Sequence, residues 1–186
     1  AMVVTYDAST DAGQRLAAAG PERWYEPVLA GDVTLGRTDP DVDPLGYRTL
    51  FVLALLDKRV DADVDLRTAV TEVADIYPET QLVSQFETGS VDAAVTYRNM
   101  AVERDYDYLD LPTAVDLSDP AHAEGYATTS YELPDGTIVE GGVISYGTTG
   151  TVRTAAVESV LRRHLSGAGL AAFGFGVPEA YPRYTG

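Results

Sequence analysis

Three short segments of the chain have the residue types that begin helices, and the start of a helix can hold an anion. They are residues 43–46 (Asp-Pro-Leu-Gly), 78–81 (Pro-Glu-Thr-Gln) and 96–99 (Thr-Tyr-Arg-Asn). The first turn of a helix has N–H groups without an intrahelical acceptor and carries about half a positive charge. Each segment alone is typical of an ordinary capped helix. Their presence together in one chain suggests an anion-binding site.

The sequence lacks the common catalytic patterns. It has no H-E-x-x-H, no G-x-S-x-G, no P-loop, and no G-x-G-x-x-G that opens a helix. His122 lies in a polar loop, and His164 follows two arginines at the expected end of a helix, where a cation meets the helix dipole favourably. Carboxylates are too numerous for a catalytic pair to be picked out. The residues alone therefore indicate no enzyme without excluding one, and the hypothesis that we carry forward is a binding protein that needs no cofactor.

The charge balance is strongly acidic. The 186 residues include 29 Asp and Glu against 13 Lys and Arg, which gives a net charge of −16. Nucleic acid is not an expected partner, because phosphate binding needs a basic surface. Lys58 is the only lysine, and the other 12 basic residues are arginines. Such a surface suits a protein that stays soluble in molar salt, where the screening length falls to about 3 Å. An acidic protein of dilute solution is the alternative.

The length allows one domain or two small lobes with a substantial core, and 45% of the residues are hydrophobic. The absence of cysteine excludes a disulfide scaffold, a cysteine zinc site and thiol catalysis. No apolar run reaches the roughly 18 residues of a membrane-spanning helix.

Hydrophobic periodicity predicts alternating strands and helices, which favours an α/β fold with a mixed sheet flanked by helices. Strands are expected at residues 2–6, 33–38, 91–97 and 106–111, with a hairpin formed by 126–133 and 137–146. Helices are expected at residues 21–29, 45–56, 65–74, 79–87, 98–103 and 155–165. Asp43 is the expected N-cap of the second helix, Pro44 its first residue, and Gly89 the C-terminal stop of the fourth.

Segments along essentially the whole chain resemble the archaeal tungstate- and molybdate-binding proteins of ABC importers. Residues 24–29 (WYEPVL) are similar to the family pattern W-Y-x-x-L-L, and residues 35–48 (LGRTDPDVDPLGYR) to G-x-x-(D/N)-P-x-x-D-P-C-G-Y-R. Further on, the similar segments are 78–82 (PETQL, family P-K-E-T-D-L), 91–98 (VDAAVTYR, family D-Y-A-F-E-Y-K), 107–112 (DYLDLP, family Y-I-E-L-P) and 144–147 (ISYG, family Y-G-I-T).

This resemblance implies a type II periplasmic-binding fold, in which two lobes clamp an oxyanion between them. By that comparison residues 1–146 form the second lobe and residues 147–186 form a C-terminal return segment with helices. The first lobe is expected to be missing from this chain.

The resemblance also implies the binding residues. The N–H groups of Leu45 and Thr80 would donate to the anion, with the one-residue register between Glu79 and Thr80 left open. Tyr97 matches a tyrosine that hydrogen-bonds the anion in the wider molybdate-binding group. Asp43 falls on a family aspartate whose carboxylate joins the coordination shell of the metal, since Mo and W can bind more than four oxygens.

Thr96 stands where the family has a second carboxylate ligand, a glutamate. Two modes of binding therefore stay open: coordination of Mo or W by Asp43, or a tetrahedral oxyanion held by hydrogen bonds alone while Asp43 caps its helix. If the lost carboxylate weakens the site, Thr96→Glu should tighten binding. Arg48, one turn into the same helix, is expected to pair with Asp39 or Asp41.

The leading hypothesis is an extracytoplasmic, cell-surface-associated solute-binding protein that hands tungstate or molybdate to the permease of an ABC importer. Contact with the membrane would come only through a lipid anchor outside this chain. An effector-binding domain of a transcription regulator with the same fold is one alternative, and an enzyme on this fold is another.

Overall fold

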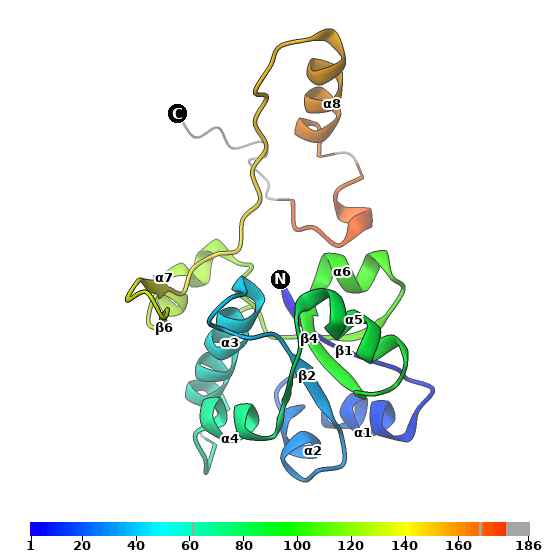
Figure 1. Ribbon diagram of the computed structural model, residues 1–186, viewed down its shortest axis with the longest axis vertical. Helices are drawn as coiled ribbons and strands as arrows, with labels where there is room; N and C mark the ends of the chain where they lie inside the picture. Colours follow the sequence, from blue (N-terminus) through cyan, green and yellow to red (C-terminus); the bar gives the residue numbers. More distant parts are fainter. Residues whose placement is uncertain (61, 168, 178–186) are drawn as a thin grey trace.

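The computed structural model describes residues 1–60, 62–167 and 169–177. Residues 1–146, here called the lobe, are built around a five-stranded sheet. Residues 147–177, here called the arm, continue from the side of the lobe that carries α7 and the β6 hairpin, carry α8 away from the lobe and return to it near α6 (Figure 1). No helix in the described ranges is long and apolar enough to cross a membrane.

The central sheet is mixed, as the sequence predicts. Its strand order is β3-β2-β4-β1-β5. β2 is parallel to both β3 and β4, whereas β1 lies antiparallel between β4 and β5. The strands are β1 (Met2–Tyr6), β2 (Leu35–Arg37), β3 (Asp75–Ile76), β4 (Ala93–Tyr97) and β5 (Asp107–Asp110).

Helices cover both faces of the sheet (Figure 1). The lobe contains α1 (Asp11–Ala19), α2 (Tyr25–Leu29), α3 (Pro44–Val60), α4 (Leu66–Val73), α5 (Glu79–Glu87), α6 (Arg98–Glu103), the 3-10 turn η1 (Pro120–His122) and α7 (Ala123–Tyr126). A separate hairpin pairs β6 (Ser130–Glu132) with β7 (Ile138–Glu140), and the arm carries α8 (Ala155–Leu165) and the 3-10 turn η2 (Ala171–Phe173).

The main core lies between the sheet and helices α1 to α4, which cover one of its two faces. Trp24, Phe51, Leu53 and Leu56 are almost completely buried there, together with Val95 of β4. Because α3 is apolar nearly all round, it is enclosed by the sheet, α4 and α7. Burying each large apolar side chain contributes roughly 1.5–3 kcal/mol to folding, so α3 is the main hydrophobic support of the lobe.

Several predicted elements are confirmed with the expected bounds: residues 2–6 form a strand, and residues 79–87, 98–103 and 155–165 form helices. The other predicted strands are present but shorter. The helix expected from residue 21 begins only at Tyr25, because residues 21–24 form a turn. The sequence analysis missed α1, which Thr10 caps by accepting a hydrogen bond from the N–H of Gly13 at 3.0 Å.

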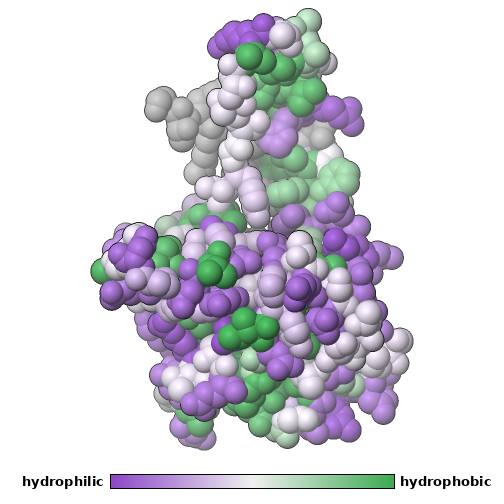
Figure 2. Space-filling view, in the orientation of Figure 1, coloured by the Kyte–Doolittle hydropathy of each residue, from purple (hydrophilic) through white to green (hydrophobic). Residues whose placement is uncertain are grey.

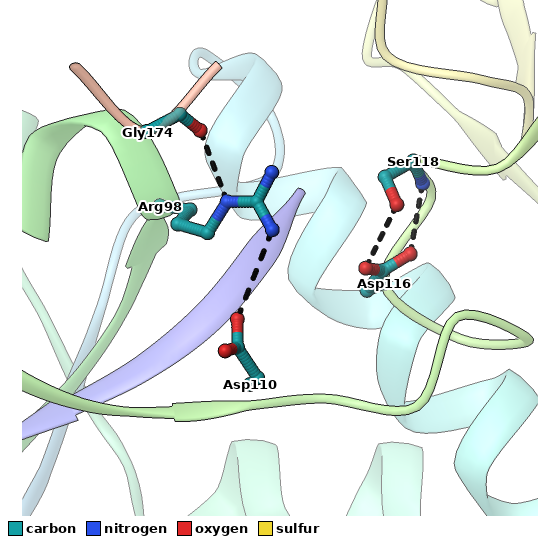
Figure 3. A network of polar contacts seen from close by, with 5 residues as sticks. All are labelled: Arg98, Asp110, Asp116, Ser118 and Gly174. Atoms are coloured by element: carbon teal, nitrogen blue, oxygen red, sulfur yellow. Dashed lines mark hydrogen bonds and ion pairs between the residues drawn. The ribbon is translucent and has the colours of Figure 1, made fainter. Parts of the chain in front are cut away.

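The arm returns to the lobe at α6. The Arg98 side chain donates from Nε to the carbonyl oxygen of Gly174 at 3.0 Å, and its Nη1 lies 3.9 Å from Oδ1 of Asp110 (Figure 3). Gly174 has φ of +76°. An added Cβ would sit 3.0 Å from the carbonyl oxygen of Arg98 and from Cα of Asn99. Glycine is therefore required by both the backbone conformation and the close approach.

The same view shows the hydrogen bonds that fix the segment after β5. The N–H and hydroxyl of Ser118 both donate to the Asp116 carboxylate at 2.9 Å (Figure 3). Burial raises the pKa of Asp116, and the two bonds from Ser118 oppose that rise. From this segment the chain passes through η1, α7 and the hairpin before it reaches the arm.

The arm itself has little packing. No residue of α8 is buried, and the exposed apolar side chains include Val152, Val160 and Phe173. Figure 2 shows hydrophobic side chains gathered over the arm, in contrast to the mostly polar surface of the lobe below it.

Candidate anion-binding site

The three segments predicted to begin helices lie at one edge of the sheet. β2, β3 and β4 run parallel, so their carboxyl ends meet at the same edge. α3 follows β2, α5 follows β3 and α6 follows β4. Ligands of open α/β sheets bind outside the carboxyl ends of the strands, where consecutive connections leave in opposite directions. Here the order β3-β2-β4 places such a switch point at β2, below the arm (Figure 1).

Asp43 caps α3, as the sequence predicts. Its Oδ1 accepts a hydrogen bond from the N–H of Leu45 at 2.8 Å. The preceding loop is pressed onto the first turn, because a Cβ on Gly46 would lie 2.5 Å from the carbonyl carbon of Asp39 and from the nitrogen of Pro40. The N–H of Leu45, expected to donate to the anion, is therefore occupied by the Asp43 carboxylate in this structure.

The start of α5 is different, because no side chain caps it. Pro78 is the N-cap residue, and its carbonyl accepts from the N–H of Gln81 and of Leu82 at 2.8 Å. The N–H groups of Glu79 and Thr80 belong to the first turn and have no intrahelical acceptor. Burial and then the charge of Asp43 raise the pKa of Glu79, so the two carboxylates face the same region. Helix α5 thus offers free donors with acidic neighbours.

Tyr97, the last residue of β4, is held by Arg48 of α3. Nη1 of Arg48 donates to the hydroxyl oxygen of Tyr97 at 2.6 Å. The guanidinium carbon also lies 5.6 Å from the Tyr97 ring centroid and 5.9 Å from that of Tyr47. Burial raises the pKa of Tyr97 to about 12, although Arg48 acts in the opposite direction. The phenol is therefore protonated at neutral pH and can donate.

The predicted pairing of Arg48 with Asp39 or Asp41 is wrong. Oδ1 of Asp39 accepts the N–H of Asp41 at 3.0 Å, and Oδ1 of Asp41 accepts the hydroxyl of Tyr131 at 2.6 Å. Both aspartates are used within the loop and the hairpin. Across the described ranges Arg48 makes no ion pair.

Tyr146 connects this group of residues to the arm. Partial burial raises the pKa of the Tyr146 hydroxyl, the charge of Arg48 lowers it and the charge of Glu79 raises it. Its ring contacts Phe175 edge-to-face, with the centroids 5.3 Å apart.

Thr96 does not join the group. Successive side chains of a strand point to opposite faces of the sheet, and Tyr97 faces α3. The Thr96 side chain faces α5 and α6, where it lines a small cavity with Leu82, Phe86 and Met100. It is 3% exposed, and its buried hydroxyl has no hydrogen-bond partner among the described residues. A carboxylate carried by this rotamer would point into apolar packing, away from Asp43.

The structure thus gathers most of the predicted residues at one edge: Asp43, Leu45, Glu79, Thr80 and Tyr97. To these it adds Arg48 and Tyr146. In the described ranges no group of three or more His, Asp or Glu side chains is arranged to hold a metal ion. The donors of the edge are N–H groups, a phenol and a guanidinium, which suit an anion with several acceptor oxygens.

Open α/β sheets bind their ligands outside the carboxyl ends of the strands, and this chain collects three helix starts there. Residues 2–135 match the model of a family described as bacterial extracellular solute-binding protein. The chain belongs to this family.

Individual relatives extend the comparison. A putative ABC transporter molybdenum-binding protein of Haloferax volcanii is 50% identical over 188 residues, which cover 100% of this chain and 61% of the relative. An uncharacterized solute-binding protein of Halobacterium salinarum is 37% identical, with 98% of this chain and 60% of the relative covered. A molybdate/tungstate-binding protein of Pyrococcus abyssi is 29% identical over 69% of this chain and 44% of its own length. The chain spans about 60% of the length of the two haloarchaeal relatives.

Proposed function

We propose that this chain is the oxyanion-receiving part of an extracytoplasmic solute-binding protein that supplies molybdate or tungstate to an ABC importer. The observation that carries the proposal is that the uncapped start of α5 and the protonated hydroxyl of Tyr97 lie at the same, carboxyl edge of the sheet. Whole-chain similarity to a protein named as molybdenum-binding supports the ligand class. The names of the relatives favour transport over the alternative of a transcription regulator.

In this proposal the N–H groups of Glu79 and Thr80 and the hydroxyl of Tyr97 donate to the oxygens of a tetrahedral oxyanion. The N–H of Leu45 joins them when the Asp43 carboxylate turns away from it. Because Asp43 caps α3 and Thr96 faces the other side of the sheet, hydrogen bonding is the mode that fits the described residues best. Direct contact of Asp43 with Mo or W is the competing mode.

The carboxylates of Asp43 and Glu79 repel an anion, so the hydrogen bonds from the local donors must contribute more than this repulsion costs. High salt screens the long-range repulsion, with a screening length of about 3 Å at 1 M, whereas close hydrogen bonds persist. Size provides selectivity, because molybdate and tungstate are larger than sulfate. No cofactor takes part, since the ligand is held and released without a chemical step.

The partners follow from the same proposal. The permease of an ABC importer accepts the loaded protein at the outer face of the membrane, and a lipid anchor outside this chain keeps the protein at the cell surface. The exposed apolar side chains of the arm, Val152, Val160 and Phe173, give it a surface on which a further lobe can pack. The capture mechanism is then closure of that lobe over the carboxyl edge.

The test is calorimetric titration of tungstate, molybdate and sulfate in molar potassium chloride, carried out on this chain and on the full-length protein. We expect saturable heat with tungstate and molybdate, and none with sulfate, at least for the full-length protein. Absence of heat with both ligands in the full-length protein would contradict the proposal.

A further inference from the structure

We propose that Arg48 is a positioning residue of this oxyanion site. It donates to the oxygen of the Tyr97 hydroxyl and thereby leaves the hydroxyl hydrogen free to be given to the bound anion. The inference rests on the proposed function. It assigns a role to a residue for which the sequence suggested only an ion pair with the neighbouring loop.

The first argument is the direction of the hydrogen bond. Arginine has donors only, so in the 2.6 Å contact the Tyr97 oxygen must be the acceptor. The phenol has a hydrogen of its own, and no acceptor for it occurs among the described residues. A hydroxyl that already accepts from a cation is also a stronger donor, because hydrogen bonds in a chain polarise one another. Tyr97 is therefore left with one free and polarised donor at the carboxyl edge.

The second argument is the charge of Arg48. The chain has a net charge of −16, and many of its arginines are paired with carboxylates. Arg48 instead lies beside the rings of Tyr47 and Tyr97, and it makes no ion pair in the described ranges. Aromatic rings attract a cation without neutralising it. The positive charge of Arg48 thus stays available beside Tyr97, at the edge of the sheet that also carries the negative charges of Asp43 and Glu79.

A double-mutant cycle separates this role from simple packing. Tungstate dissociation constants are measured by calorimetry, in molar potassium chloride, for the full-length protein and for Arg48→Met, Tyr97→Phe and the double variant. If Arg48 acts through Tyr97, we expect Arg48→Met to weaken binding about thirtyfold when Tyr97 is intact. In the Tyr97→Phe background the same substitution should weaken binding at most about threefold.

Arg67 provides the matched control. Its guanidinium carbon lies 5.7 Å from the ring centroid of Tyr131, so Arg67→Met removes one positive charge and one cation–π contact without touching Tyr97. We expect less than a twofold change in tungstate affinity for this variant. The melting temperature of each ligand-free variant is measured in parallel. If Arg48→Met lowers it, Arg48→Gln replaces that substitution in the cycle.

The outcomes are distinct. The positioning role is overturned if the Arg48 substitution lowers tungstate affinity equally with Tyr97 intact and in the Tyr97→Phe background. That result leaves the proposed function intact. An equal loss from Arg67→Met also overturns the positioning role, because the effect would then be one of overall charge. If the unaltered full-length protein binds neither tungstate nor molybdate, the proposed function fails, and this inference fails with it.

Discussion

The lobe and the arm are stabilised in different ways, although they belong to one chain. Residues 1–146 contain 27 acidic and 9 basic residues around a buried core, whereas residues 147–186 contain 2 acidic and 4 basic residues. No side chain of α8 is buried, and the described arm is tied to the lobe through the contacts of Gly174 with Arg98 and of Phe175 with Tyr146. The lobe can therefore fold on its own packing, while the arm needs a surface to cover it.

The largest expected effect comes from placing a charge in the buried interior of the lobe. Thr96→Glu places a carboxylate among Leu82, Phe86 and Met100. Burying an unpaired charge there should lower the free energy of unfolding by about 4 kcal/mol, measured by chemical denaturation. The sequence alone predicted a different result for this substitution, namely tighter binding of tungstate or molybdate.

Thr96→Val is the control for that substitution. It removes a buried hydroxyl that has no partner among the described residues and keeps the shape of the side chain, so stability should stay the same or rise. A stable Thr96→Glu protein with improved tungstate affinity would show that the side chain at position 96 reaches the site.

The second prediction compares one apolar truncation in each region. Leu53 of α3 is fully buried, so Leu53→Ala should cost about 3 kcal/mol. Val160 of α8 is 69% exposed, so Val160→Ala should change the stability of this chain by less than about 0.5 kcal/mol. Denaturant titration of both variants checks the contrast. A cost above about 1.5 kcal/mol for Val160→Ala would show that α8 is covered after all.

Salt provides the third prediction. The negatively charged side chains of the lobe outnumber the positive ones and repel one another, and salt screens that repulsion. Raising potassium chloride from about 0.1 to about 2 M should increase the free energy of unfolding of the lobe by about 2 kcal/mol. This corresponds to a rise in melting temperature of about 6 °C. The circular dichroism of a peptide spanning 150–167 should respond far less. A lobe with the same melting temperature in dilute buffer would contradict a halophilic origin of its charge.

The smallest expected effect concerns the attachment of the arm. Gly174→Ala forces a side chain into a left-handed conformation and against the backbone of Arg98 and Asn99, at a cost of about 1–2 kcal/mol. Because the lobe does not depend on this contact, its melting temperature should stay within about 2 °C. Hydrogen exchange of the α6 amides should become faster. Protection that is unchanged in α6 would show that the arm is held elsewhere.

Local patterns were enough to predict much of the fold. The Asp43-Pro44 start of α3, the Gly89 stop of α5 and the turn at Pro134-Asp135-Gly136 each act within a few residues, and the elements next to them were found. Helix α1 was missed because Leu16 is its only large buried side chain and because Gly13, a poor helix former, lies in its first turn. Thr10 at its start and Gly20 at its end were the signals that could have revealed it.

The site was harder to predict, because its contacts cross the sheet. Nothing near Arg48 in the sequence shows that its partner is Tyr97, 49 residues away, while Asp39 and Asp41 are close by but engaged in turn and hairpin bonds. The face to which Thr96 points depends on the phase of β4 against its neighbours, which a motif does not reveal. Helix starts can be read from sequence, but the side chains that meet between them cannot.

The position of β1 has a consequence for synthesis of the protein. This strand is made before every other element of the lobe, yet it pairs with Ala93–Tyr97 on one side and Asp107–Asp110 on the other. At about 5–20 residues per second, a ribosome needs roughly 5 to 20 seconds to add the roughly 100 intervening residues. Throughout that interval Met2–Tyr6 is an apolar segment without its partners. β2, β3 and β4 can pair with one another earlier, but the five-stranded sheet cannot be completed until β5 has been made.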